Sequence, residues 1–417
     1  MKTVTIIGAG FSGLVAAWRL QKQGYAVSVI EAKANVGGLI STLNHPMGLV
    51  ETAANGLLAS ALVEELFTDC GLRVQTPRKT AKRRFLAVDG KLQRLPLTFV
   101  EAFRAGLKAF RIRSTPPRPR ETVREWGERA VGQAVTGKIL STAMLGIYAA
   151  PGSELSAMYT VGRYFDPDRA TVKGKMRGTV SAPGGMGMLI QRLRATLERR
   201  GVKFETSNEA DSDVLLASRA LGPVVIALSA WSAAKLLSSA SASPALQNRA
   251  KLLAEIESIG LVTVTLFFNE KPPKLGFGTL FSQTPPHGES DGVLGCLQSS
   301  EIFEGRVTGG QHAETWILGG REKGDEFNAK SDEELLSSIY LKRDRMIQPM
   351  SRGLVVGQVI TRWPRAIPFY GIELETIVPQ LTEALDGTVL FGNYLGDLGL
   401  ASILERTGDL VRRVNNI

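Results

Sequence analysis

The opening segment of the chain, TVTIIGAGFSGLVAAWRLQKQGYAVSVIEA (residues 3–32), constrains the fold more than any other part of the sequence. Residues 4–7 are a short apolar run with β-branched side chains, which predicts a buried strand. A glycine-rich turn follows, then a helical pattern over residues 14–20 and a second apolar run over residues 27–30. Strand, glycine turn, helix and strand in this order predict a nucleotide-binding βαβ unit.

Each glycine of the turn has its own physical role in such a unit. Gly8 permits the tight turn, Gly10 lets the backbone approach a pyrophosphate, and Gly13 lets the helix lie close to the sheet. The open amides at the start of the helix favour negative phosphates. Glu31 is placed to accept hydrogen bonds from ribose hydroxyls, and its charge disfavours a 2′-phosphate. A lone GxGxxG also occurs in ordinary glycine turns, but the whole pattern indicates a dinucleotide site.

A second glycine turn decides between NAD and FAD. Gly37 and Gly38 follow soon after Glu31, which suits a backbone lying against the longer FAD. With Thr42, this turn resembles the glycine-pair signature of FAD-dependent amine-oxidase-type oxidoreductases. That family usually has Arg or Lys after the pair, whereas this chain has Leu39, so one charged contact is absent or supplied elsewhere. The expected FAD contacts of this half are Gly8, Ala9, Gly10, Phe11, Ser12, Gly13, Glu31, Ala32, Gly37, Gly38, Leu39 and Thr42.

Composition limits the other classes of site. A chain of 417 residues, 44% hydrophobic and 22% charged, is an ordinary globular protein of two or three domains. Cys70 and Cys296 are the only cysteines, so we expect no disulfide framework and a reducing cytoplasm. His45, His287 and His312 are scattered without ligand spacing, so no metal site is predicted.

Charge is concentrated in one segment. Residues 78–124 hold 14 Lys and Arg against three Asp and Glu, which accounts for the whole net charge of +10. This segment therefore meets something anionic: a carboxylate substrate, acidic lipid or nucleic acid. We see no secretory signal and no apolar stretch long enough to span a bilayer.

Secondary-structure patterns predict an interrupted nucleotide domain. Strand, turn and helix patterns open the chain, return over residues 181–237 and close it over residues 388–414. A sheet built from three separated stretches implies that another domain is inserted. Between them we expect a hairpin of residues 85–88 and 91–95, helices over 61–71, 97–114 and 121–145, and strands over 261–268, 293–298 and 313–318.

Several segments together resemble the oxygen-dependent protoporphyrinogen oxidase family. They include VETAANGLLAS (50–60), RRFLAVDGKLQRLP (83–96), the helix-rich stretch 121–157 and FGNYLGDLGL (391–400), and the resemblance covers nearly the whole chain. It implies an α/β fold with a discontinuous Rossmann-type FAD-binding domain, an inserted α+β substrate domain and a helical membrane-binding subdomain. The implied bounds are 1–59, 179–237 and 371–417 for the FAD-binding domain, 60–90, 166–178 and 238–370 for the substrate domain, and 91–165 for the helical subdomain.

The same resemblance implies a reaction. A porphyrinogen, either protoporphyrinogen IX or coproporphyrinogen III, is oxidised to the porphyrin in heme biosynthesis, with FAD as the hydride acceptor and O2 as the oxidant. The cofactor carries the difficult chemistry, so no catalytic protein residue is predicted. Two alternatives stay open: another amine oxidase or desaturase of the superfamily, and a flavin-binding protein without turnover that handles tetrapyrroles.

The implied substrate contacts are few. Arg84 matches the family arginine that holds a propionate, since a guanidinium binds a carboxylate in a bidentate manner; otherwise it is one more solvated charge. Gly278, Leu280 and Ile317 match positions that line the flat macrocycle, although core packing explains them almost as well. Ala150 replaces a glycine of the family near the flavin face.

A closing turn completes the implied cofactor site. The helix after Gly399 would direct its positive end toward the pyrimidine edge of the flavin. The alternative is a strand-to-helix turn that has no role in cofactor binding. The expected contacts here are Gly392, Asn393, Gly399, Leu400, Ala401 and Ser402.

Two further departures from the family pattern concern the loop of residues 206–222, which is shorter than usual, and Gly371-Ile372, where the family has Gly-His. The shorter loop bears on the contacts to the adenine, and neither departure removes the FAD fingerprint; together with Ala150 they leave room for a shifted substrate or a weakened enzyme.

The basic segment contains an amphipathic pattern. Phe99, Phe103, Leu107 and Phe110 share one helical face, and three cations flank it: Arg104, Lys108 and Arg111. Such a helix suits an anionic lipid surface, or else packs on its own domain with a solvated basic side. With the resemblance, we expect a cytoplasmic protein that is peripheral on the cytoplasmic face of the membrane. No nucleic-acid module is visible, and the sequence admits a homodimer.

Overall fold

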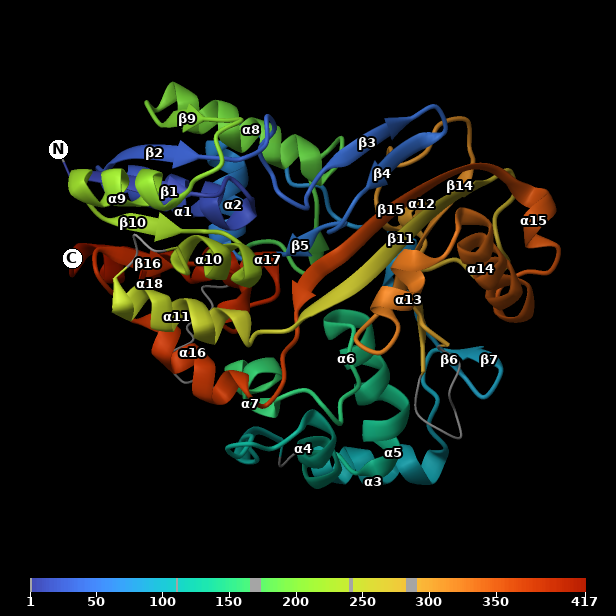
Figure 1. The fold of residues 1–417 in the computed structure, drawn as a ribbon. Coiled ribbons are helices and arrows are strands. Elements are labelled where there is room, and N and C mark those ends of the chain that lie inside the picture. Colours follow the sequence, from blue (N-terminus) through green and yellow to red (C-terminus); the bar gives the residue numbers. More distant parts are fainter. Residues whose placement is uncertain (1, 110–111, 166–173, 240–242, 283–290) are drawn as a thin grey trace.

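The opening motif starts a parallel sheet, as predicted. The computed structural model describes residues 2–109, 112–165, 174–239, 243–282 and 291–417. Within these ranges, β1 pairs in parallel with β2 and β10, and the five-stranded order is β16-β10-β1-β2-β9 (Figure 1). The strands are β1 Thr3–Ile7, β2 Ala26–Ile30, β9 Lys203–Glu205, β10 Val224–Ile226 and β16 Thr388–Leu390.

Helices cover both faces of this sheet. Val4 and Ile6 of β1 bury on one side and Ile7 on the other, because successive side chains of a strand point to opposite faces. The first side packs on α1 Phe11–Lys22, α2 Ala61–Asp69, α8 Met186–Arg199, α17 Leu400–Glu405 and α18 Thr407–Asn415. The second packs on α9 Ser212–Leu221, α10 Ala230–Leu237, α11 Pro244–Ala254 and α16 Leu374–Thr382.

A second, mostly antiparallel sheet lies beside the first (Figure 1). Its order is β15-β11-β14-β13-β12-β6-β7, and β6 with β12 is its parallel pair. The strands are β6 Arg84–Val88, β7 Lys91–Gln93, β11 Ser258–Phe268, β12 Gly278–Phe281, β13 Val293–Leu297, β14 His312–Gly319 and β15 Val355–Pro368. There are also two small two-stranded sheets: the hairpin of β3 Thr42–His45 with β4 Gly48–Glu51, and the antiparallel pair of β5 Leu57–Leu58 with β8 Thr179–Val180.

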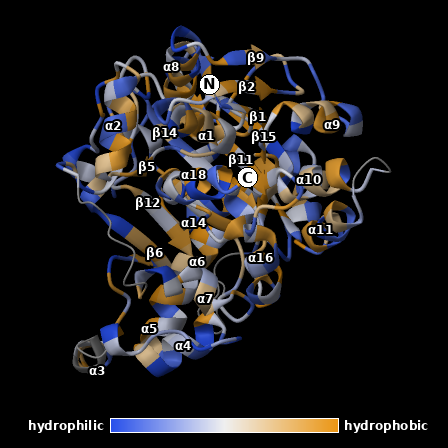
Figure 2. Ribbon diagram, turned by 90° about the vertical axis from the view of Figure 1, so that its left-hand side faces the viewer, coloured by the Kyte–Doolittle hydropathy of each residue, from blue (hydrophilic) through white to orange (hydrophobic). Residues whose placement is uncertain are grey.

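The two sheets have different apolar cores. Figure 2 shows hydrophobic colour along the strands and hydrophilic colour on many outer helical turns. One face of the second sheet buries Val264, Phe268 and Trp316 against two helices. These helices are α13 Gly324–Ala329 and α14 Asp332–Met346, while α12 Ser299–Ile302 and α15 Ser351–Leu354 are single turns near the sheet ends.

The helical region differs from the prediction in its continuity. The single helix expected over 121–145 is broken at Gly132, whose φ of +92° is incompatible with a regular helix. The segments are α3 Phe99–Ala109, α4 Val123–Ala130, α5 Gln133–Val135, a π-helical turn Thr136–Leu140, α6 Ser141–Tyr148 and α7 Ala157–Thr160. Three residues named in the sequence analysis lie outside the described residues: Phe110 of the apolar helical face, the flanking Arg111, and His287.

One predicted domain boundary falls inside a strand pair. The predicted division between residues 90 and 91 falls inside the β6–β7 hairpin, where Leu86 pairs with Gln93 and Asp89 and Gly90 form the turn with positive φ. β7 therefore belongs to the sheet with β6. The remaining domain bounds stay a prediction, although the strands of the parallel sheet do come from the three predicted stretches.

Strand β15 is absent from the sequence prediction. It contains Pro364, and proline is tolerated at a sheet edge because its missing N–H faces no partner. β15 is the edge strand, and its pairing with β11 shifts register between Ile259 and Leu261, opposite the proline.

None of the helices in the described ranges is long and apolar enough to cross a membrane.

A buried charged network links β14 to α14. Arg343 donates to Glu314 in a bidentate manner, with Nε–Oε2 at 2.9 Å and Nη2–Oε1 at 3.0 Å, and both side chains are fully buried. His312 Nε2 lies 3.2 Å from Glu314 Oε1, and Trp316 Nε1 donates to Oε2. Burial acts to raise the pKa of Glu314, but the contacts of His312 and Arg343 lower it to about 2.

We predict that Glu314→Gln lowers the free energy of unfolding by about 3–5 kcal/mol near neutral pH, because it leaves the charge of Arg343 buried without a partner. The folded pKa of Glu314 lies below that of an unfolded glutamate. The contribution of ionised Glu314 to the free energy of unfolding is therefore complete above about pH 4.5 and is lost as the pH falls toward 2.

Urea unfolding of both proteins between pH 7 and pH 3 measures this difference, which should shrink with acidification. Glu326→Gln, which removes an exposed carboxylate on α13, is the control and should leave stability nearly unchanged. A wild-type advantage that stays constant over the whole range would contradict the assignment.

Candidate cofactor and substrate site

The turn between β1 and α1 is fixed by close backbone packing. Gly8 has a φ of +102°, and its amide donates to the Ile30 carbonyl at 2.8 Å. A Cβ placed on Gly13 would lie 1.8 Å from the Gly8 carbonyl oxygen. The roles predicted for these two glycines, a tight turn and close approach of the helix, are therefore both present in the geometry.

The next part of the turn is an open cradle. Gly10 forms an isolated bridge with Gly37, whose amide donates to Ala9 O at 2.8 Å. A Cβ on Gly10 would meet only Gly38 Cα, at 3.9 Å, and Gly38 is exposed. Gly10 caps α1 without a side-chain hydrogen bond, so the first-turn amides at Phe11 and beyond are open to a phosphate. This geometry fits a dinucleotide.

Glu31 stands at the carboxyl end of β2 with its carboxylate fixed. Oε2 accepts from the Ala9 amide at 2.7 Å, and Oε1 accepts from the Lys33 amide at 2.9 Å. A carboxylate has further lone pairs, so Glu31 can still accept from ribose hydroxyls. Ala32, beside it, is exposed.

Two of the predicted FAD contacts, Thr42 and Leu39, already have hydrogen-bond partners within the protein. The Thr42 hydroxyl donates to Glu51 Oε2 at 2.7 Å and accepts from the Gly187 amide at 2.8 Å, so it is already used within the protein. Leu39 is half-buried, and its carbonyl accepts from Thr52 Oγ1. A contact of either residue with FAD stays a prediction.

The closing turn lies at the same edge of the parallel sheet. It follows β16, and a Cβ on Gly392 would lie 3.3 Å from the Leu228 carbonyl, just beyond β10. Asn393 O accepts from the buried Tyr370 hydroxyl. Ligands of open α/β sheets bind at the carboxyl ends of the strands, so the two predicted halves of the FAD site share one edge. Gly399 is exposed, Leu400 is half-buried, and Ala401 and Ser402 are buried at the start of α17.

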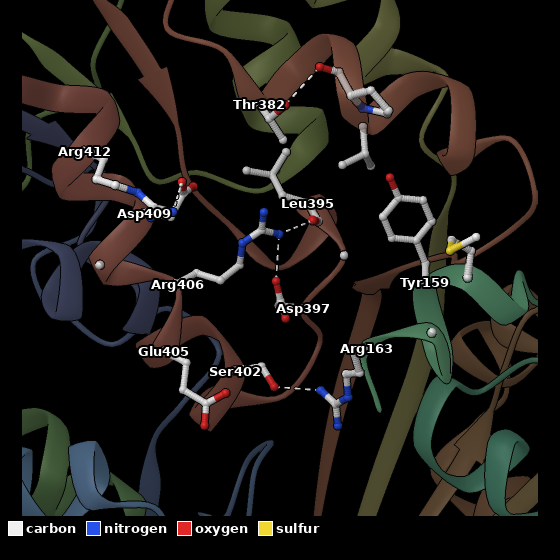
Figure 3. A pocket seen from close by; sticks show the side chains of 16 residues that line it. Tyr159, Arg163, Thr382, Leu395, Asp397, Ser402, Glu405, Arg406, Asp409 and Arg412 are labelled. Atoms are coloured by element: carbon white, nitrogen blue, oxygen red, sulfur yellow. Dashed lines mark hydrogen bonds and ion pairs between the residues drawn. The ribbon is translucent and has the colours of Figure 1, made fainter. Parts of the chain in front are cut away.

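A cavity of about 880 Å³ adjoins this turn (Figure 3). It lies between α7, the 3-10 turn Gly162–Tyr164, α16 and the α17–α18 pair. Arg163 reaches across it and donates from Nη1 to Ser402 Oγ at 2.7 Å, as Figure 3 shows. Arg406 donates to Asp397 at 2.7 Å on the other wall.

The predicted substrate residues come together on one face of the second sheet. Leu280 pairs with Gly295, which pairs with Ile317, so these three positions form a row across β12, β13 and β14. Arg84 pairs with Gly278 two positions along, on the same face. Leu280 and Ile317 are both half-buried, and the row faces away from the α13–α14 core.

The glycine gap in this row is Gly295, which sequence reasoning missed. Gly278 is buried, and a Cβ there would lie 2.1 Å from Cys296 O, so strand packing alone requires a glycine at that position. Gly295 instead separates Leu280 from Ile317, and a Cβ there would crowd Leu280 at 3.1 Å. The register of three strands decides this assignment, and the sequence does not contain it.

Phe277 is a second missed residue. The Arg84 guanidinium lies over the Phe277 ring at 4.6 Å from its centroid. Arg84 is exposed, and no carboxylate in the described part of the chain forms an ion pair with it. Stacking holds the guanidinium in place while leaving its N–H groups available to an anion. Phe277 lies within the GFGTL motif (residues 276–280), which was the sequence signal from which its role could have been predicted.

Ala150 is accommodated without strain at its own position. The left-handed residue of the turn is Ala149, with φ +54°, and not Ala150, which is fully buried. The Ala149 carbonyl accepts from the Arg321 amide at 2.8 Å, which ties the end of α6 to the end of β14. Ala150 belongs to the apolar cluster on which Ile317 packs. The glycine-to-alanine departure therefore leaves this wall well packed.

The short segment 206–222 is also ordered. Asp211 caps α9 by accepting from the amides of Asp213 and Val214. No group of His, Cys, Asp and Glu in the described ranges could hold a metal ion. His312 is instead part of the buried network, and His45 stacks on Phe267.

Comparison with known proteins agrees with this geometry. The family model for flavin containing amine oxidoreductases matches residues 11–394. The chain belongs to this family. It is an FAD-dependent oxidoreductase.

The relatives cover almost the whole chain. It is 25% identical to a chloroplastic protoporphyrinogen oxidase of Nicotiana tabacum, over 98% of this chain and 84% of that protein. It is 21% identical to coproporphyrinogen III oxidase of Bacillus subtilis, over 97% and 96% of the two chains. Cyclohexylamine oxidase of Brevibacterium oxydans shares the fold, with a TM-score of 0.68, 18% identity and coverage of 98% and 99%.

We predict that Gly10→Ala folds normally but binds FAD at least tenfold more weakly, because the added methyl group points into the cradle and meets little protein. Flavin absorbance per chain and the melting temperature measure the two effects. Gly353→Ala, whose Cβ also enters open space far from the cradle, is the control. Full flavin content in Gly10→Ala would place the cofactor elsewhere.

Proposed function

We propose that the protein oxidises a porphyrinogen to the porphyrin with FAD and O2, in heme biosynthesis. The observation that carries this proposal is a cationic, stacked Arg84 at the edge of an apolar sheet face with a glycine gap. A flat tetrapyrrole with acidic side chains has that combination of surfaces. The near full-length similarity to protoporphyrinogen and coproporphyrinogen oxidases supports it.

Each part of this site has a role in the reaction. When bound, FAD supplies the acceptor for a hydride from a methylene bridge and passes the electrons to O2. Arg84 binds a propionate and sets the position of the ring, and Phe277 holds the guanidinium. Leu280 and Ile317 contact the macrocycle and exclude water, and Ala150 supports the wall behind Ile317. The driving force is aromatisation of the ring, so no strongly basic residue is required.

The substrate is protoporphyrinogen IX or coproporphyrinogen III, which differ in their number of propionates. An amine oxidase activity is the alternative on the same fold, which cyclohexylamine oxidase shares with a TM-score of 0.68. An amine would be attracted poorly to a site whose exposed charge is Arg84. Tyr394 of the closing turn is fully buried, so its ring does not line an open amine site.

Anaerobic titration of the purified flavoprotein tests the proposal. Either porphyrinogen should bleach the flavin absorbance, and air should restore it with formation of peroxide. Bleaching by a primary amine and not by porphyrinogens would favour an amine oxidase. Bleaching by neither would leave a flavin-binding protein without this activity and overturn the proposal.

We predict that Arg84→Ala raises KM for the porphyrinogen by about tenfold or more, with unchanged flavin content, because a charge-assisted contact to a carboxylate is lost. Arg84→Lys should recover only part of the effect, since an ammonium is not bidentate. Arg83→Ala removes a neighbouring charge of the same basic segment and is the control. If steady-state kinetics give the same KM for all variants, Arg84 is a solvated surface charge that does not contact the substrate.

We further propose that α3 attaches the protein to the cytoplasmic face of a membrane. Phe99 is 88% exposed and Phe103 is 61% exposed, and Leu95 and Val100 are exposed beside them. Aromatic residues beside a strongly basic segment suit an interface of anionic lipid. The division into an FAD-binding domain, a substrate domain and a helical membrane-binding subdomain belongs to the same proposal.

We predict that the protein sediments with vesicles containing anionic lipid at low salt and is released at high salt, because screening weakens the attraction. Phe99→Glu with Phe103→Glu should abolish sedimentation without changing flavin content. Leu216→Glu, at an exposed apolar position on α9, is the matched control. Sedimentation that persists in the double variant would contradict an insertion of α3.

A further inference from the structure

Arg163 occupies an unusual place beside the closing turn. It comes from the 3-10 turn Gly162–Tyr164 and crosses to α17, where Nη1 donates to Ser402 Oγ at 2.7 Å (Figure 3). Its Nη2 donates to the Tyr164 hydroxyl at 3.0 Å, and the guanidinium lies 5.0 Å from the Tyr164 ring centroid. The arginine is thus held by two neutral hydroxyl groups.

Within the described part of the chain, the Arg163 guanidinium has no carboxylate in direct contact. No carboxylate among the described residues forms an ion pair with it, and its buried Nε has no hydrogen-bond partner there. Asp397 acts on it only at longer range, because that carboxylate is already paired with Arg406 at 2.7 Å. Arg412 is likewise paired, with Asp409 at 3.1 Å. Of these three arginines on the cavity wall, Arg406 and Arg412 form ion pairs with described carboxylates, whereas Arg163 forms none within the described residues.

Ser402 connects Arg163 to the first turn of α17. Its side chain is 5% exposed, and a Cβ on Gly399 would lie 3.8 Å from Ser402 Oγ, so the hydroxyl lies beside the start of α17. Because Oγ accepts from Arg163, its own proton remains to be donated. No described atom accepts that proton. A hydroxyl that accepts from a cation is a stronger donor than a free one.

We propose that Arg163, acting through Ser402, is a positioning residue that stabilises negative charge on the pyrimidine edge of reduced FAD and so raises its reduction potential. The inference rests on the proposed function, because it places the flavin at the Gly399–Ser402 turn. Charge near this edge is one of the means by which a protein tunes a bound flavin. Arg163 and Ser402 both line the adjoining cavity.

The experiment measures the bound flavin and not turnover. Arg163→Gln and Ser402→Ala are purified with FAD, and the two-electron midpoint potential and the sulfite dissociation constant are measured with wild-type protein. Sulfite adds to oxidised flavin and is favoured by the same positive charge. Each variant should destabilise the reduced flavin about tenfold, a fall in potential of about 30 mV for a two-electron couple, and weaken sulfite binding about tenfold.

Two control variants separate charge from structure. Arg163→Lys keeps the charge and should retain most of the wild-type potential. Arg412→Gln removes a paired charge from the same cavity and should have no effect. Unchanged potential and sulfite affinity in flavin-loaded Arg163→Gln would overturn the inference. If that variant does not fold or load FAD, Ser402→Ala decides, since it removes one hydroxyl only.

The failure of this inference differs from that of the proposed function. A wild-type protein that binds no flavin, or whose flavin no porphyrinogen reduces, contradicts the proposed function. A wild-type flavoprotein reduced by porphyrinogen, whose potential does not respond to Arg163, contradicts only the role of Arg163.

Discussion

The approach of α1 to the Gly8 carbonyl is the constraint on which the rest of the structure depends. At Gly13 no side chain fits, because a single Cβ would stand 1.8 Å from that oxygen. With hydrogen there, the helix lies on the sheet and buries Leu14, Val15 and Trp18 completely. The same approach aims the first-turn amides at the carboxyl edge of the strands. Core packing and cofactor geometry are therefore determined together at one position.

Local patterns predicted the parts of the fold whose physics is local. The βαβ unit, the Asp89-Gly90 hairpin and strands β11, β13 and β14 follow from periodicity and turn chemistry that act within a few residues. The prediction of a continuous helix over 121–145 was wrong because α4 ends before Gly132, which takes a positive φ and donates its amide to the Gly127 carbonyl at 3.0 Å. β15 was missed since Pro364 argues against a strand unless its place at the edge is known.

The candidate site shows the same division. The FAD cradle could be predicted, because its glycines and Glu31 lie within one supersecondary unit. The proposed substrate face could be predicted only through family resemblance, since Arg84, Leu280 and Ile317 are far apart in sequence. Gly295, Phe277 and Arg163 were not predicted at all. Their roles depend on strand register and on a contact of 2.7 Å between residues 239 positions apart, which no short pattern contains.

The order of strands in the parallel sheet has a consequence for biosynthesis. β1 and β2 are translated early, but β10, which pairs with β1, lies roughly 200 residues later, and β16, which pairs with β10, lies later still. At about 5–20 residues per second, the free edge of β1 waits on the order of tens of seconds for β10, and the sheet is complete only when β16 follows. During that time Ile6 and Ile7 stay without their final cover. The nascent chain must then be shielded from aggregation, and the yellow cofactor can be fully enclosed only after translation of the last strand.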